Sequence, residues 1–141
     1  MTEKYNVICI KWGAGYPSED ANKLCSMIKR NTSFDIDFYC FTDNPEGLSP
    51  DIIVKPLPVM HVAPEDNKYA YRKEAGLCDD NLGGLTGQRV FFFDLDSLIV
   101  GNLDEFSTWC LQDIPDCINN CCFPRIIFAN KNIHAFMNMY F

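Results

Sequence analysis

The chain of 141 residues has the length of one domain with a sizeable core. Its formal net charge of -7 argues against a general binder of nucleic acid or of anionic membranes, because such proteins carry a basic face. Hydrophobic residues make up 48% of the chain, which is ordinary for a globular protein. No window approaches the roughly 18–20 apolar residues of a membrane span, and no signal-peptide pattern follows Met1. The sequence therefore predicts a cytoplasmic protein without a transmembrane segment.

The eight cysteines do not follow the spacing of a disulfide scaffold or of a zinc site. No CxxC pair occurs, and the two histidines, His61 and His134, lie far from the cysteines near residue 120. Cys9 and Cys40 fall inside apolar runs that resemble strands, and Cys25 falls on a helical pattern. These positions indicate reduced, buried thiols with a structural role.

Apolar runs predict three strands in the first part of the chain, over residues 5–10, 34–41 and 52–57. A glycine-containing loop follows the first run, and a helix is predicted over residues 19–30 because acids occupy its first turn and bases its last. The predicted buried face of this helix consists of Ala21, Leu24, Cys25 and Ile28. Pro56 and Pro58 end the third run, which predicts a strand at the edge of the sheet.

A second helix is predicted over residues 67–82, ended by the glycines that follow Leu82. The run Val90–Leu95 then predicts a central strand buried on both faces. Strands that alternate with helices predict an α/β fold, a three-layer sandwich with a mostly parallel central sheet. Ligands of such sheets bind beyond the carboxyl ends of the strands, so we expect the loop after residue 10, Thr42-Asp43 and Asp94-Asp96 to lie on one edge.

Asp94 and Asp96 form a DxD motif where the central strand ends. Two carboxylates are costly to bury unless a positive charge compensates them, and a divalent cation takes carboxylate oxygens readily. The motif therefore indicates a metal site. The alternative is that both side chains only cap the turn.

Five segments in order resemble bacterial nucleotide-sugar glycosyltransferases of the GT-A fold, namely NVICIKWGAGYP, FYCFTDNPEGL, KPLP, YRKEAGL and FFFDLDSLIVGNLDEF. The resemblance covers residues 6–106. It implies a metal-dependent transferase that moves a sugar from a nucleotide-diphosphate sugar, with a UDP-sugar as the expected donor. It implies a glycan or a lipopolysaccharide-type acceptor, and for the latter a place at the inner face of the membrane.

The resemblance implies that Asp96 is the main ligand of Mn²⁺ or Mg²⁺, and that Asp94 contacts the metal through water or the ribose. The metal would stabilise the charge that develops on the departing nucleoside diphosphate. The other implied nucleotide-sugar contacts are Lys11, Trp12, Gly13, Tyr16, Asp43 and Lys73. No catalytic residue is implied.

Each of these contacts has a plainer alternative. Lys11 and Lys73 can be ordinary solvated lysines, and Asp43 can cap the turn that follows the second strand. Trp12 and Tyr16 can stack on a base or simply pack the loop. We expect Asp104 and Glu105 to begin a short helix.

The composition changes after residue 106. The last 35 residues hold 4 of the 31 charged side chains but 4 of the 8 cysteines, and they show nothing of the family. We therefore expect a GT-A-like nucleotide-sugar-binding domain over residues 1–106 and an atypical tail over residues 107–141, packed on the same domain. A frameshift, a deletion or an unrelated replacement would explain this tail, and the enzyme would then be truncated.

Two other functions fit parts of the pattern. A non-catalytic nucleotide-binding remnant would keep the donor site without turnover. A haloacid-dehalogenase-like phosphatase would use Asp94 as nucleophile and Asp96 as acid and base. That family normally carries Gly-Thr after the second Asp and places the motif on its first strand, whereas here Ser97-Leu98 follow and about 90 residues precede.

Overall fold

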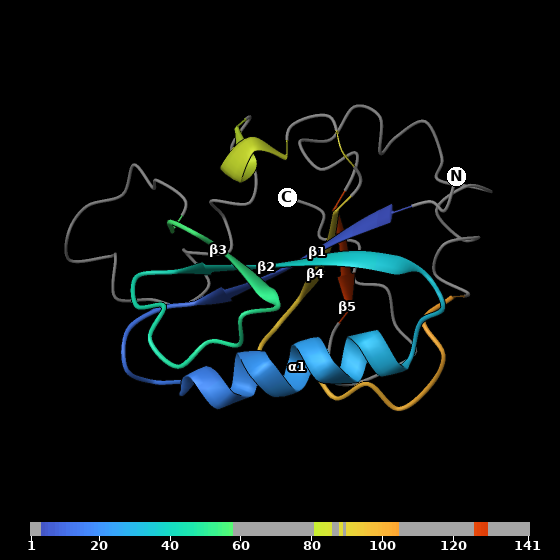
Figure 1. Ribbon diagram of the computed structural model, residues 1–141, viewed down its shortest axis with the longest axis horizontal. Helices are drawn as coiled ribbons and strands as arrows, with labels where there is room; N and C mark the ends of the chain where they lie inside the picture. Colours follow the sequence, from blue (N-terminus) through green and yellow to red (C-terminus); the bar gives the residue numbers. More distant parts are fainter. Residues whose placement is uncertain (1–3, 58–80, 86–87, 89, 105–125, 130–141) are drawn as a thin grey trace, which may run out of the picture.

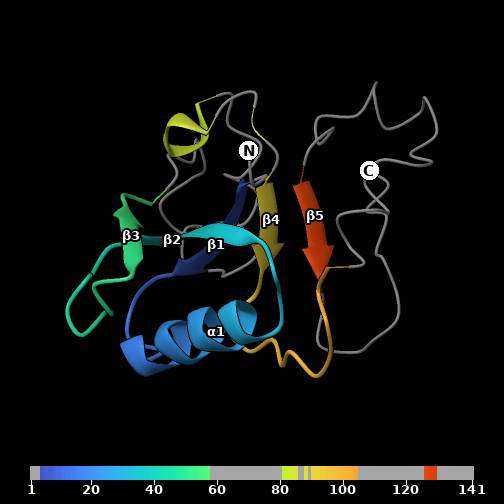
Figure 2. The same ribbon diagram turned by 45° about the vertical axis from the view of Figure 1, so that its right-hand side comes forward.

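A computed structural model of the chain describes residues 4–57, 81–85, 88, 90–104 and 126–129. These residues form a five-stranded sheet in the order β3-β2-β1-β4-β5, in which every neighbouring pair is parallel (Figures 1 and 2). The strands are β1 (Lys4–Lys11), β2 (Asp35–Thr42), β3 (Ile52–Lys55), β4 (Val90–Phe93) and β5 (Ile126–Ala129). The predicted α/β fold with a parallel central sheet is confirmed.

The strands β1 and β4 form where apolar residues dominate the sequence. All residues of β1 after Lys4 are buried, and all four residues of β4 are buried, as a strand covered on both faces requires. The strand β3 lies at an edge of the sheet and ends at Lys55, immediately before Pro56, which confirms the predicted edge position.

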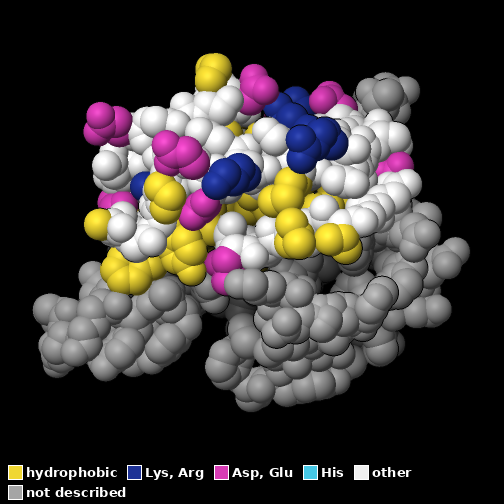
Figure 3. Space-filling model, turned by 90° about the horizontal axis from the view of Figure 1, so that it is seen from below, with side chains coloured by type: hydrophobic (Ala, Val, Ile, Leu, Met, Phe, Trp, Pro, Cys, Tyr) yellow, Lys and Arg dark blue, Asp and Glu magenta, His cyan; other side chains and the backbone are white. Residues whose placement is uncertain are grey.

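Helix α1 (Ser18–Arg30) covers one face of the sheet. Glu19 and Asp20 lie in its first turn and Lys29 and Arg30 in its last, an arrangement that favours the helix dipole. Its outer side, seen from below in Figure 3, carries basic and acidic side chains interspersed. The predicted inner face is confirmed, since the buried helix residues are Ala21, Leu24, Cys25 and Ile28.

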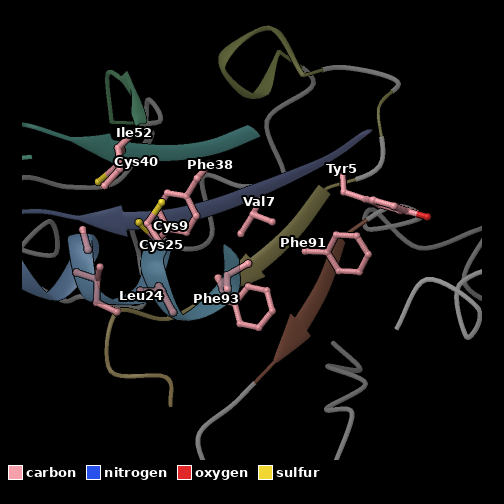
Figure 4. Packing of buried hydrophobic residues seen from close by; sticks show 13 residues of the cluster. Tyr5, Val7, Cys9, Leu24, Cys25, Phe38, Cys40, Ile52, Phe91 and Phe93 are labelled. Atoms are coloured by element: carbon pink, nitrogen blue, oxygen red, sulfur yellow. The ribbon is translucent and has the colours of Figure 1, made fainter. Parts of the chain in front are cut away.

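Two apolar clusters lie on opposite faces of the sheet. The first joins α1 to the sheet and includes Tyr5, Val7, Cys9, Leu24, Phe38, Phe91 and Phe93 (Figure 4). The second contains Ile8, Ile10, Phe41, Leu82, Leu85, Val90 and Phe92. The alternation of β1 and β4 side chains between the two clusters follows from the period of two along a strand.

The short 3-10 helix η3 (Leu82–Gly84) covers the face of the sheet opposite α1. Gly83 has φ of 52°, and an added Cβ would lie 2.9 Å from the Phe41 ring, so this position requires glycine. The helix predicted over residues 67–82 otherwise lies outside the described residues. None of the described helices has the length and hydropathy needed to cross a bilayer.

The chain after β4 differs from the prediction. The strand ends at Phe93 rather than Leu95, because the chain turns at Asp94. The apolar residues that follow form no strand; Leu98 is 67% and Val100 87% exposed, and Ile99 packs against the first cluster. Residues 126–129, within the tail set apart on composition, pair with β4 as a strand. The proposed boundary at residue 106 stays a prediction.

Asp104 lies in a turn at the end of this segment, and Glu105 lies outside the described residues. The Asp104 Oδ1 accepts hydrogen bonds from Thr32 Oγ1 at 2.7 Å and from the Ser33 N–H at 2.8 Å. The Leu103 N–H donates to the Asn31 carbonyl at 2.7 Å. These hydrogen bonds link the segment after β4 to the loop between α1 and β2.

Replacing Leu24 by Ala should lower the free energy of unfolding by about 2–5 kcal/mol, because this fully buried side chain would leave a cavity beneath the sheet. Urea denaturation followed by circular dichroism measures the change. The matched control is Lys23→Ala on the exposed side of the same helix, whose ion pair with Asp20 is long and exposed. Equal losses in the two variants would contradict the assigned buried face.

Hydrogen bonds from the Ser33 N–H and the Thr32 hydroxyl hold the pKa of Asp104 below its ordinary value of 3.8. A carboxylate with a lowered folded-state pKa stabilises the fold above its unfolded pKa, and this contribution is lost as the pH falls through the folded pKa. We expect Asp104→Asn to be less stable than the parent at neutral pH, with a difference that shrinks below about pH 4. Urea midpoints across pH measure it.

The control for this pH series is Asp35→Asn, an exposed carboxylate at the start of β2. Its midpoint should stay near that of the parent throughout. A difference between parent and Asp104→Asn that persists unchanged to the lowest pH would rule out the ionised Asp104 carboxylate as its source.

Candidate functional site

Three polar segments meet at the carboxyl edge of the sheet. Because β1, β2 and β4 are parallel neighbours, the loops that follow Lys11, Thr42 and Phe93 start at the same edge. The strand order reverses between β1 and β4, with β2 and β3 on one side and β5 on the other. In open α/β sheets, ligands bind beyond the carboxyl ends of strands at such a reversal. The predicted common edge is confirmed.

Asp94 and Asp96 lie in a tight turn at this edge. The Ser97 N–H donates to the Asp94 carbonyl at 3.0 Å, and the Leu95 N–H donates to Asp94 Oδ1 at 2.8 Å. Both carboxylates are exposed, whereas Leu95 and Ser97 between and after them are buried. The cost of burying two carboxylates therefore does not arise here, and the metal site stays a prediction. The strand ends before Asp94, so the turn keeps both carboxylates in water.

Exposed carboxylates can still bind a divalent cation. Mg²⁺ usually keeps several waters and is held by one or two carboxylates together with the phosphates of a substrate. The described part of the chain contains no group of three or more His, Cys, Asp or Glu side chains that could hold a metal ion. Asp94 and Asp96 alone therefore fit a metal that arrives with a phosphate ligand better than they fit a permanently bound structural ion.

Lys11, at the end of β1, is only 4% exposed, so the interpretation as an ordinary solvated lysine was wrong. Its Nζ donates to the Asn44 carbonyl at 3.4 Å, a long and weak hydrogen bond. The Thr42 hydroxyl donates to the same carbonyl at 3.0 Å. The loop after Thr42 thus supplies, through the Asn44 carbonyl, a hydrogen-bond acceptor to the buried lysine.

Asp43 joins the two loops that follow β1 and β2. The Gly13 N–H donates to both of its carboxylate oxygens, at 3.1 Å and 3.0 Å. Gly13 has φ of 61°, which favours glycine at this turn. The turn after β2 is instead capped by Thr42 Oγ1, which accepts from the Asn44 N–H, and by Asn44 Oδ1, which accepts from the Glu46 N–H. Asp43 therefore holds the first loop, a role that neither sequence interpretation included.

The remaining predicted contacts divide into three cases. Trp12 is half-buried and packs against the second apolar cluster. Tyr16 is 41% exposed on the same loop. Lys73 lies outside the described residues. The structure therefore brings Lys11, Trp12, Gly13, Tyr16, Asp43, Asp94 and Asp96 to one edge of the sheet.

Sequence reasoning missed Asn44 and Ser97. The Thr42-Asp43-Asn44 sequence is typical of turns in which side chains bond nearby backbone, and this signal could have identified the cap at Asn44. Ser97 is 6% exposed, and its hydroxyl is a buried polar atom without a hydrogen-bond partner among the described residues. No sequence pattern distinguishes this serine from a solvated turn residue.

An apolar cavity of about 30 Å³ lies away from this edge, near the start of β1 and the end of α1. Its lining includes Tyr5, Ile28, Phe34, Phe91 and Leu103. Its lining is apolar except for Thr32, so it offers no charged group to a phosphate. It is a packing gap of the first apolar cluster.

Comparison with known proteins returned no matching family model, no matching curated protein and no matching solved structure.

Replacing Asp43 by Ala should speed hydrogen exchange of the Gly13 amide, because its charged acceptor is removed. Amide exchange of the loop after β1, followed by NMR or mass spectrometry, measures the change. Glu46→Ala is the control, since this exposed side chain is on the same turn and the hydrogen bonds found there use only the Glu46 backbone. Unchanged exchange in Asp43→Ala would contradict the proposed link between the two loops.

Proposed function

We propose that the chain is the donor-binding domain of a metal-dependent glycosyltransferase, which binds a nucleotide-diphosphate sugar at the carboxyl edge of its sheet. The observation that supports this most is the position of the DxD carboxylates. Asp94 and Asp96 are exposed at the end of β4, next to β1, where the strand order reverses. The resemblance of residues 6–106 to GT-A enzymes supplies the substrate class.

Asp94 and Asp96 would hold Mn²⁺ or Mg²⁺ through their exposed oxygens. The metal would act as a Lewis acid toward the diphosphate of the donor when bound. The Leu95 N–H donates to Asp94 Oδ1 and holds one carboxylate against its own turn, while the preceding strand β4 is fully buried. The turn with the two carboxylates thus directly follows a well-packed strand, which favours a defined geometry for the ligand.

Lys11 would contribute positive charge toward the diphosphate. Its ammonium is nearly buried and has one long hydrogen bond to a carbonyl, so a phosphate oxygen would be a better partner than the one it has. The loop from Trp12 to Tyr16, held by Asp43, would contact the nucleoside. In this arrangement Asp43 positions the Gly13 backbone and does not itself need to touch the base.

The acceptor in this proposal is a glycan or a lipid-linked saccharide of the lipopolysaccharide type, and the protein acts in the cytoplasm or at the inner face of the membrane. These parts rest on the family resemblance alone.

Calorimetric titration with UDP and with GDP, in the presence and absence of Mn²⁺, tests the proposal. We expect the chain to bind a nucleoside diphosphate with an affinity that Mn²⁺ increases. Asp94→Asn/Asp96→Asn should weaken binding in Mn²⁺ by at least about 10–100-fold, because the amides lose the charge that holds the metal. Without Mn²⁺ the variant and the parent should bind alike.

The control variant Asp35→Asn/Asp51→Asn removes two exposed carboxylates near the amino ends of β2 and β3 and should bind as the parent does. Equal weakening in both variants would assign the effect to net charge rather than to the DxD turn. Metal-dependent binding without transfer or hydrolysis of the sugar would favour a non-catalytic nucleotide-binding domain. Phosphatase activity without nucleotide binding would contradict the proposal.

A further inference from the structure

Three buried thiols from three different elements lie on the face of the sheet that α1 covers. Cys9 of β1 and Cys40 of β2 are 0% exposed, and Cys25 of α1 is 3% exposed. Figure 4 shows the three side chains in the same part of the first apolar cluster. All three are free, and they form no metal-binding group with other described residues. The proposed function uses none of them.

Cys9 and Cys40 face each other across neighbouring strands. They are Cα partners in the parallel register of β1 and β2, and both side chains point into the first cluster. Neighbouring strands lie about 4.7–4.9 Å apart, which is inside the range of about 4.4–6.8 Å found between Cα atoms of a disulfide. Cys25 approaches the pair from the helix instead and shares no strand register with either thiol.

The two thiols are also electrostatically unequal. Side-chain hydrogen bonding between the two thiols raises the pKa of Cys9 and lowers the pKa of Cys40. The positive charge of nearby Lys11 lowers the pKa of Cys40 further, whereas burial opposes its ionisation. Cys40 is therefore the better nucleophile of the pair, since the thiolate is the reactive form.

We propose that Cys9 and Cys40 form a redox modification site, in which a small two-electron oxidant such as hydrogen peroxide closes a disulfide between β1 and β2. The Cys40 thiolate attacks one peroxide oxygen, the O–O bond breaks, and a sulfenic acid and one water form after proton transfer. The Cys9 sulfur then attacks the Cys40 sulfur, and the hydroxyl leaves as a second water with the Cys9 proton. Two thiols are oxidised and one peroxide is reduced.

Burial and strand spacing determine how fast this disulfide forms and how easily it is reduced. Because both thiols are fully buried, oxidation requires a small oxidant or a local opening and should be slow. A disulfide needs Cβ atoms about 3.5–4.5 Å apart, so the two strands must approach slightly, and the bond should be readily reduced by dithiothreitol. The bond would lie two residues before Lys11 and two before Thr42, directly beneath the candidate site.

Peptide mapping of the whole chain tests the inference. The folded protein is treated with hydrogen peroxide, quenched, alkylated in denaturant and digested with trypsin without reduction. Trypsin places Cys9 on residues 5–11, Cys25 on residues 24–29 and Cys40 on residues 31–68. We expect a linked pair of the first and third peptides, two hydrogen masses lighter than their sum, which dithiothreitol separates.

Cys25→Ala should retain this linked pair, and Cys9→Ala and Cys40→Ala should lose it. Circular dichroism establishes whether each variant folds. If a variant does not fold, peptide mapping of the parent protein decides whether Cys9 and Cys40 form the disulfide. The proposal would be overturned if Cys9 and Cys40 stayed alkylatable after oxidation of the folded parent. Exclusive pairing of either thiol with Cys25 or with a cysteine beyond residue 57 would overturn it equally. The test does not involve nucleotide, so its outcome is separate from that of the proposed function.

Discussion

The parallel pairing of β1 with β2 on one side and with β4 on the other is the constraint on which the rest of the structure depends. A central strand buried on both faces must satisfy its backbone groups within the sheet, because no water reaches them. Once all three strands run the same way, their carboxyl ends coincide. Segments that begin at Lys11, Thr42 and Phe93, far apart in the chain, then share one edge.

At the carboxyl edge, some polar groups hold the loops in place, and others remain exposed to solvent. Asp43 and the Asn44 carbonyl accept hydrogen bonds from the first loop and from Lys11, so they mainly hold the edge together. Asp94 and Asp96 remain exposed on a turn carried by a buried strand. The proposed ligand, a nucleotide-diphosphate sugar with its metal, would bring phosphate and metal charge to this turn.

The buried thiols of Cys9 and Cys40 lie in the core, close to the strand ends that form the candidate site. Cys9 and Cys40 are register partners of β1 and β2 in the first apolar cluster, and the positive charge of Lys11 lowers the pKa of Cys40. A change in the covalent state of this pair would act on the two strands whose ends carry Lys11 and Asp43. The redox inference and the donor-site proposal therefore concern adjoining parts of the molecule, although each stands on separate observations.

The sequence by itself determined the strands β1 to β4, the inner face of α1 and the edge position of β3, because apolar runs, helical periodicity and proline are local signals. The strand β5 was not predicted, and only its pairing with β4 shows it. The sequence placed the DxD motif at the end of the central strand, but it continued that strand to Leu95, two residues past its end at Phe93. Tertiary structure alone decided that Lys11 is buried, that Asp43 binds the Gly13 backbone and that both DxD carboxylates stay in water. Only the tertiary structure makes Cys9 and Cys40 partners in the register of β1 and β2. Burial and partners depend on which loops meet after the strands pair, and no pattern within one segment carries that information.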